Sequence, residues 1–129
     1  MKSSQLNNND NPSASSPRDN PCLDRDSALA VLKVIADDGI SYLLPYAQFM
    51  YAEKIPNPAL EKEPDAPPEK MWIRFACADV VVLGSGLQRL EQDIQKYELK
   101  FVKAADRRLA ATLNTHIAAL TVTLAKEKI

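Results

Sequence analysis

The clearest alternation of apolar and polar positions lies between residues 71 and 83. Residues 71–76 divide into an apolar face and a mixed face, namely Met71, Ile73 and Phe75 against Trp72 and Arg74. After a short break at residues 77–79, residues 80–83 are apolar on both faces, which indicates a strand buried from both sides. Two such runs around a short break predict a β-hairpin.

Residues 86–97 have the apolar spacing of an amphipathic helix. The predicted stripe has steps of three, four and three residues and consists of Leu87, Leu90, Ile94 and Tyr97. Ser85 and Gln88 fit a capping box at the start of this helix. A strand at residues 98–103 should follow, with Leu99 and Phe101 on one face and Lys100 and Val102 on the other.

The segment before this region has two interpretations. Residues 27–36 fit a helix capped by Asp26 and Ser27, but residues 30–35 also fit a strand that turns at residues 36–39. The density of Val and Ile favours the hairpin, with residues 40–44 as its second strand. Pro45 then marks an edge, a bulge or a strand end, and residues 46–52 fit a helical face better than a strand.

The C-terminal region has a helical spacing of apolar residues. The steps are four, four, three and four residues through Leu109, Leu113, Ile117, Leu120 and Leu124. With Asp106 as the N-cap, this spacing predicts a helix that continues to residue 112 or 113. The β-branched run at residues 121–123 leaves a strand as the alternative for residues 117–124.

These elements predict one α+β domain over residues 23–129. We expect a mainly antiparallel sheet of four or five strands, packed by the helix at 86–97 and a C-terminal helix. Residues 1–22 are rich in Ser, Asn, Asp and Pro, so we predict a disordered tail. Residues 56–70 are rich in Pro and predict an exposed loop, which includes a P-x-x-P sequence at 64–67.

Composition excludes some function classes. The 129 residues carry a formal net charge of −1, whereas dedicated nucleic-acid binders usually carry a basic excess. The two cysteines, Cys22 and Cys77, do not have the spacing of a disulfide framework or a metal site, and the single His116 lacks ligand neighbours. We therefore expect free thiols, no metal and no cofactor. We also expect a cytoplasmic protein, because no signal peptide or membrane-spanning run is visible.

The turn Gly84-Ser85-Gly86 resembles a phosphate-binding loop only in part. A dinucleotide fingerprint requires a third Gly where the chain has Arg89, and no Walker ending is present. The pattern therefore favours a structural turn. An anion or nucleotide site at Ser85, Gly86 and Arg89 is the weakest functional hypothesis.

The leading hypothesis is a non-enzymatic module that binds a partner protein or a second copy of itself. No nucleophile stands near a base in the sequence, and an aromatic cluster supplies contact surface: Tyr42, Tyr46, Phe49 and Tyr51. The alternative is a nucleic-acid-binding accessory protein that uses a local basic stripe: Lys96, Lys100, Lys103, Arg107 and Arg108.

Overall fold

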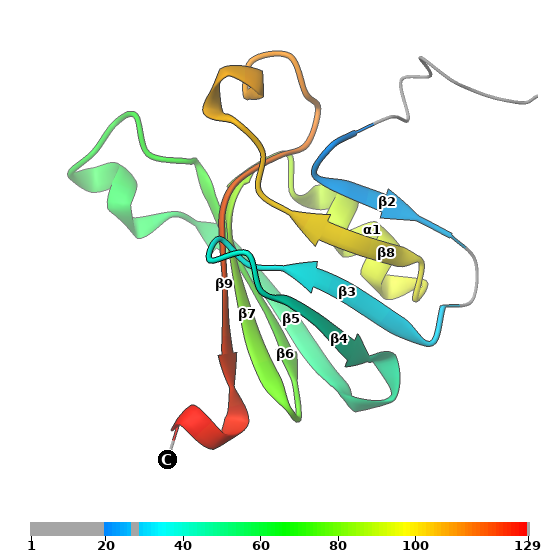
Figure 1. Cartoon of the computed structure of the whole chain (residues 1–129). Helices are drawn as coiled ribbons and strands as arrows, with labels where there is room; N and C mark the ends of the chain where they lie inside the picture. Colours follow the sequence, from blue (N-terminus) through cyan, green and yellow to red (C-terminus); the bar gives the residue numbers. More distant parts are fainter. Residues whose placement is uncertain (1–19, 27–28, 129) are drawn as a thin grey trace, which may run out of the picture.

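The computed structural model describes residues 20–26 and 29–128, which form two four-stranded sheets and one α-helix (Figure 1). The first sheet has the order β2-β8-β3-β4 and contains β2 (Leu23–Arg25), β8 (Leu99–Lys103), β3 (Val31–Ile35) and β4 (Ser41–Pro45). The second has the order β5-β6-β7-β9 and contains β5 (Phe49–Pro56), β6 (Glu69–Phe75), β7 (Ala78–Ser85) and β9 (His116–Leu124). The helix is α1 (Gln88–Gln95), and the 3-10 turns are η1 (Tyr46–Gln48), η2 (Pro58–Glu61), η3 (Arg107–Leu109) and η4 (Ala125–Lys128).

The predicted α+β class is confirmed in its coarse form, but the predicted single sheet is wrong. Every strand pairing is antiparallel except the parallel pair of β3 and β8. β8 follows the helix and joins the first sheet, whereas the β6–β7 hairpin belongs to the second sheet. Local sequence predicts the β6–β7 hairpin and β8 as strands, but the choice of sheet depends on which edge each strand meets after the chain has crossed the core.

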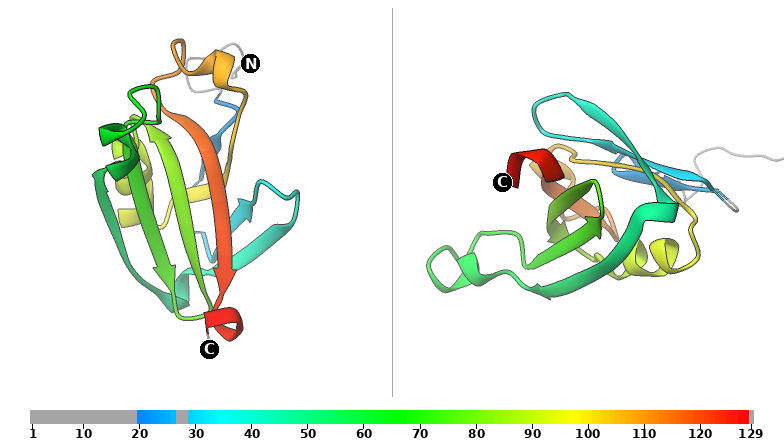
Figure 2. Two further views of the ribbon diagram at one scale, coloured as in Figure 1. Left: turned by 90° about the vertical axis from the view of Figure 1, so that its left-hand side faces the viewer. Right: turned by 90° about the horizontal axis from the view of Figure 1, so that it is seen from below.

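The apolar core lies between the two sheets and receives one face of each. The predicted alternation of β6 is confirmed, since Met71, Ile73 and Phe75 are at most 1% exposed. Residues 80–83 are not buried on both sides as predicted, because Val81 and Leu83 are only half-buried while their alternating neighbours are fully buried. The outer face of the second sheet is thus partly open, and α1 packs behind the sheet on its core side (Figure 2).

The hairpin interpretation of residues 30–44 is confirmed by the antiparallel pairing of β3 with β4. Gly39 has a φ of +88° in the turn, a conformation that favours glycine. The side chain of Asp38 supports the turn because its Oδ1 accepts a hydrogen bond from the Ile40 N–H at 3.0 Å. Pro45 is the last residue of β4, and the following segment forms η1 and then β5 instead of the expected helix.

The predicted C-terminal helix is wrong. Asp106 is an N-cap, but only of the short η3, where its Oδ1 accepts from the Arg108 N–H at 2.9 Å. β9 then pairs with β7 from the Ala78–Leu124 pair to the Ser85–His116 pair. Ile117 and Leu120 are buried in this strand. A long ladder and β-branched residues therefore outweigh the helical spacing of leucines, which is a weak local preference.

The exposure pattern of β8 also differs from the prediction. Leu99 and Val102 are both fully buried, although simple alternation would place them on opposite faces. The pairing of β8 with β2 shifts register between Asp24 and Arg25, which explains the broken alternation. A bulge depends on the partner strand and is not visible in the local pattern.

Residues 20–22, which we predicted as the end of the disordered tail, are among the described residues. Residues 1–19 of the expected disordered tail lie outside the described residues, but Cys22 is fully buried in the core. Its Sγ accepts a hydrogen bond from the Ile117 N–H at 3.4 Å. On the same edge of β9, the Asp37 N–H donates to the Leu120 carbonyl and Asp37 Oδ2 accepts from the Leu120 N–H, both at 3.0 Å. These contacts connect the first sheet to β9.

Candidate binding surface and groove

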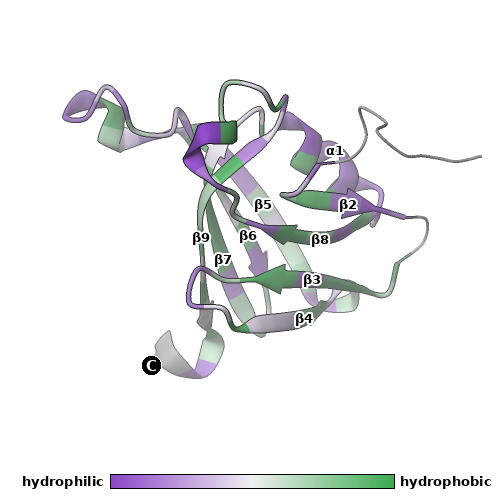
Figure 3. Ribbon diagram, turned by 45° about the horizontal axis from the view of Figure 1, so that its top comes forward, coloured by the Kyte–Doolittle hydropathy of each residue, from purple (hydrophilic) through white to green (hydrophobic). Residues whose placement is uncertain are grey.

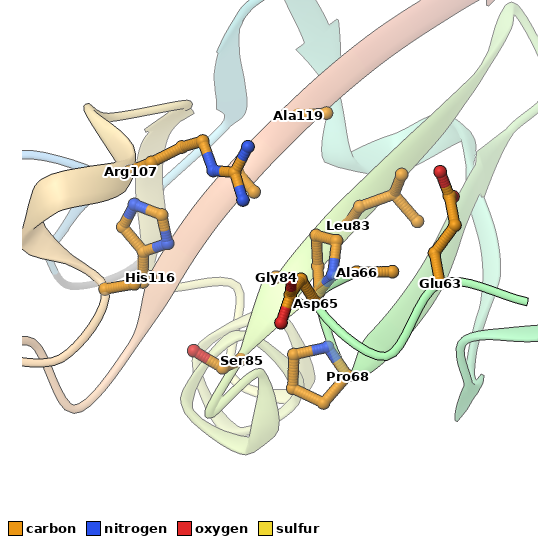
Figure 4. A pocket seen from close by; sticks show the side chains of 13 residues that line it. Glu63, Asp65, Ala66, Pro68, Leu83, Gly84, Ser85, Arg107, His116 and Ala119 are labelled. Atoms are coloured by element: carbon orange, nitrogen blue, oxygen red, sulfur yellow. The ribbon is translucent and has the colours of Figure 1, made fainter. Parts of the chain in front are cut away.

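An open groove of about 640 Å³ lies where the second sheet meets two loops. One wall is the loop between β5 and β6, the floor is formed by the end of β7 and the start of β9, and η3 forms the other wall (Figure 4). The loop wall contributes the acidic Glu63 and Asp65, whereas η3 contributes the guanidinium of Arg107. The groove thus combines opposite charges with an apolar floor at Leu83 and Ala119.

The loop wall is held in place by one buried polar side chain. Asn57 is 6% exposed, and its Nδ2 donates to the Pro67 carbonyl at 2.8 Å. Its Oδ1 accepts from the Ala59 N–H at 3.1 Å and so caps η2. The hydrogen bonds of Asn57 therefore join the two ends of the Pro-rich loop at 56–70, which contains a short 3-10 turn.

His116 lies at the groove wall and has a structural anchor. The residue is 3% exposed, and Nε2 lies 3.1 Å from the Ala105 carbonyl and 3.0 Å from the Asp106 carbonyl. Both partners are acceptors, so Nε2 carries the proton and fixes the start of β9 against the segment that follows β8. Nδ1 is then an acceptor in the neutral ring.

The Gly84-Ser85-Gly86 turn is explained by packing. A Cβ on Gly84 would collide with the His116 carbonyl, and a Cβ on Gly86, whose φ is +63°, would collide with the Asn114 carbonyl. Glycine therefore allows the segment before β9 to approach the turn closely. Ser85 lines the groove and makes no capping bond, so the predicted capping box is wrong.

A carboxylate already occupies the N-terminus of α1. The Leu87 N–H donates to Glu69 Oε1 at 2.9 Å, and Glu69 also lies 3.8 Å from Lys54 Nζ. A helix N-terminus attracts negative charge, and here that charge comes from β6 of the same chain. A carboxylate of the same chain thus partly neutralises the positive end of the helix dipole.

The outer face of the second sheet carries aromatic and basic side chains and continues into the groove. We define the outer patch as Tyr51, Lys70, Trp72, Arg74, Val81 and Leu83, which share the face turned away from the core. Lys70 Nζ lies 4.3 Å from the centre of the Trp72 ring. The Arg74 guanidinium carbon lies 5.6 Å from the Trp72 ring and 5.7 Å from the Tyr51 ring. Leu83 belongs to both the patch and the groove floor.

Cation–π contacts and one ion pair fix the orientation of the patch. Arg74 Nη1 donates to Asp79 Oδ2 at 2.9 Å, and its side chain remains 31% exposed. Arginine stacked on aromatic rings presents a flat, rigid surface. The face also carries Glu53 opposite Trp72, so two basic residues are balanced by two acidic ones. The outer face as a whole is therefore amphipathic and close to neutral, although the outer patch itself carries two basic residues.

The structure distributes the predicted aromatic cluster over several environments. Tyr46 is buried, its hydroxyl donates to the Leu99 carbonyl at 2.6 Å, and burial raises the pKa of its phenol. Phe49 packs edge-on against Phe75 with ring centres 5.7 Å apart. Tyr51 belongs to the outer patch, whereas Tyr42 is half-buried on β4, in the other sheet.

The predicted basic residues are likewise spread over the molecule. Arg89 Nε lies 3.7 Å from Asp93 Oδ2, and Arg108 Nη2 lies 2.9 Å from Asp106 Oδ2, so each has a carboxylate partner. Arg107 faces the groove. The lysines occupy other elements: Lys96 ends α1, Lys100 is exposed on β8, and Lys103 ends β8.

Sequence reasoning missed Trp72, Arg74, Lys70 and His116 as candidate site residues. The first three alternate with the buried residues of β6 and so share its outer face. A Trp between two cations on that face could have been recognised in the sequence. The place of His116 in a groove wall depends on the pairing of β9 with β7 and has no local signal. Among the described residues, no group of three or more His, Cys, Asp or Glu side chains is arranged to hold a metal ion.

Comparisons with protein-family models, curated proteins and solved structures found no match to this chain. Within the described residues, no helix has the length and apolar character needed to cross a membrane.

Proposed function

We propose that this protein is a binding module that receives a segment of a partner protein on the outer patch and in the adjoining groove. The observation that carries the proposal is the half-exposed Trp72, held between Lys70 and Arg74 on a sheet face that no described element covers (Figure 2). Trp, Tyr and Arg are the side chains that dominate binding energy at protein interfaces.

The groove adjoins the outer patch and suits a partner segment that carries both positive and negative charge. Its acidic loop wall suits a basic side chain of the partner, and Arg107 on the opposite wall suits a carboxylate. The apolar floor at Leu83 suits an aliphatic or aromatic anchor between these charges. We therefore expect an extended partner segment that carries a basic residue, an apolar residue and an acidic residue in close succession.

Charge favours a protein partner over a nucleic acid. Aromatic and basic side chains also form stacking platforms for single strands, but such platforms lie in basic grooves. Here Glu53 and Asp79 balance the patch, and Glu63 and Asp65 line the groove. Phosphate binding would have to overcome this negative charge.

The test compares proteins retained from host lysate by the immobilised full chain and its variants. Trp72→Ala and Leu83→Asp alter the patch, while Tyr97→Ala removes a 51% exposed aromatic residue from the turn after α1 as a control. We expect a partner whose retention falls at least tenfold for both patch variants, about 1.4 kcal/mol or more, and is unchanged for the control. The partner must then bind in purified form.

Two outcomes would contradict the proposal. One is that no retained protein distinguishes Trp72→Ala from Tyr97→Ala. The other is that a fluorescent single-stranded oligonucleotide binds the wild type in a salt-dependent manner and loses binding in Trp72→Ala, which would assign the patch to nucleic acid.

A further inference from the structure

The free edge of β4 differs from the other three sheet edges. β2 has three residues, exposes Asp24 and Arg25 and shifts register between them, and its exposed end is strongly hydrophilic (Figure 3). β5 carries Glu53 and Lys54 and also has a register shift. Short length, charge and bulges are the usual devices that prevent a sheet edge from pairing with another chain.

The outer edge of β9 is protected by contacts within the chain. The backbone groups of Ile117 bond to Cys22 and Ala105, and those of Leu120 bond to Asp37. Among the described residues, no such contact protects the outer edge of β4, and its one protective feature is Pro45 at its end. Its sequence from Ser41 to Pro45 contains no charged residue, its pairing with β3 has no register shift, and Leu43 is 65% exposed.

The alternation of hydrogen-bonded and non-hydrogen-bonded pairs in the β3–β4 hairpin identifies the backbone groups of β4 that point away from β3. The Ala36 N–H donates to the Ile40 carbonyl, and the Tyr46 N–H donates to the Ala30 carbonyl, both at 2.9 Å. Bonded pairs alternate along an antiparallel ladder, so Ser41, Leu43 and Pro45 direct their backbone groups away from β3. Pro45 is tolerated there because its missing N–H is on the free edge.

We propose that two copies of this chain associate through antiparallel pairing of β4 with β4, with the two-fold axis at Tyr42. In this register, Ser41 of each copy lies opposite Leu43 of the second copy, and each pair exchanges both of its backbone hydrogen bonds. A two-fold axis at Leu43 is less favourable, because Ser41 would then face Pro45 and its carbonyl would lack a donor. The dimer thus joins two four-stranded sheets into one continuous sheet.

Side chains near β4 support a second copy as the occupant. Leu43 and Val31, which are 65% and 39% exposed, share the outer face of the hairpin, and Ile40 at its end is 52% exposed. The sheet extended across the axis covers part of this apolar area. The pairing does not involve the outer patch on the second sheet, so it is independent of the proposed partner site.

The first test measures the mass of the full chain by size-exclusion chromatography with light scattering. We expect a concentration-dependent dimer for the wild type and for Leu43→Val, which keeps the backbone donor. Leu43→Pro removes an outward N–H that β3 does not use, so the variant should keep its far-UV circular dichroism and become monomeric. A monomeric wild type at the highest soluble concentration, or a folded Leu43→Pro dimer, overturns the proposal.

The second test remains decisive if Leu43→Pro fails to fold. Residues that face each other in a non-hydrogen-bonded antiparallel pair have Cα atoms about 4.5 Å apart, within disulfide range. Tyr42→Cys should therefore form a reducible, disulfide-linked dimer under mild oxidation, while the wild type and Lys33→Cys, on the inner strand β3, should not. Equal cross-linking of Tyr42→Cys and Lys33→Cys, or none in either, overturns the proposed axis.

Discussion

The three glycines of the chain allow two physical costs to be separated by matched substitutions to alanine. Gly39 has a positive φ but no atom within 4 Å of an added Cβ, so its substitution tests backbone conformation alone. Gly84 has no positive φ, but its added Cβ would meet the His116 carbonyl, so it tests collision alone. Gly86 combines a φ of +63° with a collision at the Asn114 carbonyl.

The expected magnitudes follow from these differences. A left-handed alanine costs about 1–2 kcal/mol, and the lower entropy of the unfolded alanine chain offsets about 0.4–1 kcal/mol. Gly39→Ala should therefore reduce the free energy of unfolding by about 1 kcal/mol. Collision with packed backbone costs about 1–3 kcal/mol, which we expect for Gly84→Ala. Gly86→Ala should lose about 2–4 kcal/mol, a large part of the stability of a small domain.

Urea unfolding followed by the fluorescence of Trp72, the single tryptophan, and by far-UV circular dichroism measures all three variants. The order of loss should be Gly86→Ala, then Gly84→Ala, then Gly39→Ala. A Gly86→Ala variant as stable as Gly39→Ala would refute the packing explanation of the turn. The motif would then need a functional reason, such as ligand binding.

Three further predictions concern buried groups. Tyr46→Phe leaves the Leu99 carbonyl without its donor, so urea unfolding should show a loss of about 1–3 kcal/mol; an unchanged midpoint would contradict this role. Burial raises the pKa of Asp93, so the folded state binds its proton more readily than the unfolded state and stability falls as pH rises through that pKa. Asp93→Asn should therefore be more stable than wild type at neutral pH, with the difference shrinking in acid; a less stable variant at neutral pH would show that its ion pair outweighs desolvation. Burial also raises the pKa of the Cys22 thiol, so iodoacetamide should modify the half-buried Cys77 first, as judged by peptide mass mapping, and equal rates would contradict the packing of Cys22.

Local sequence determined the elements that need only an apolar surface to pack against, whichever residues supply that surface. The alternation at Met71, Ile73 and Phe75 specified β6, the Asp-Gly turn specified the β3–β4 hairpin, and the stripe at Leu87, Leu90 and Ile94 specified the buried face of α1. Periodicity and turn chemistry act over a few residues, so they can be recognised without knowing the remainder of the chain.

Tertiary structure decided the features that depend on which strands meet. Residues 116–124 have leucines at helical spacing, yet they become β9 because β7 offers a long ladder and a buried face for Ile117 and Leu120. The bulge that buries both Leu99 and Val102 depends on pairing with β2. Trp72 remains partly exposed because α1 and the first sheet both pack against the opposite face of the second sheet. Such outcomes depend on contacts between residues distant in sequence, which local pattern does not encode.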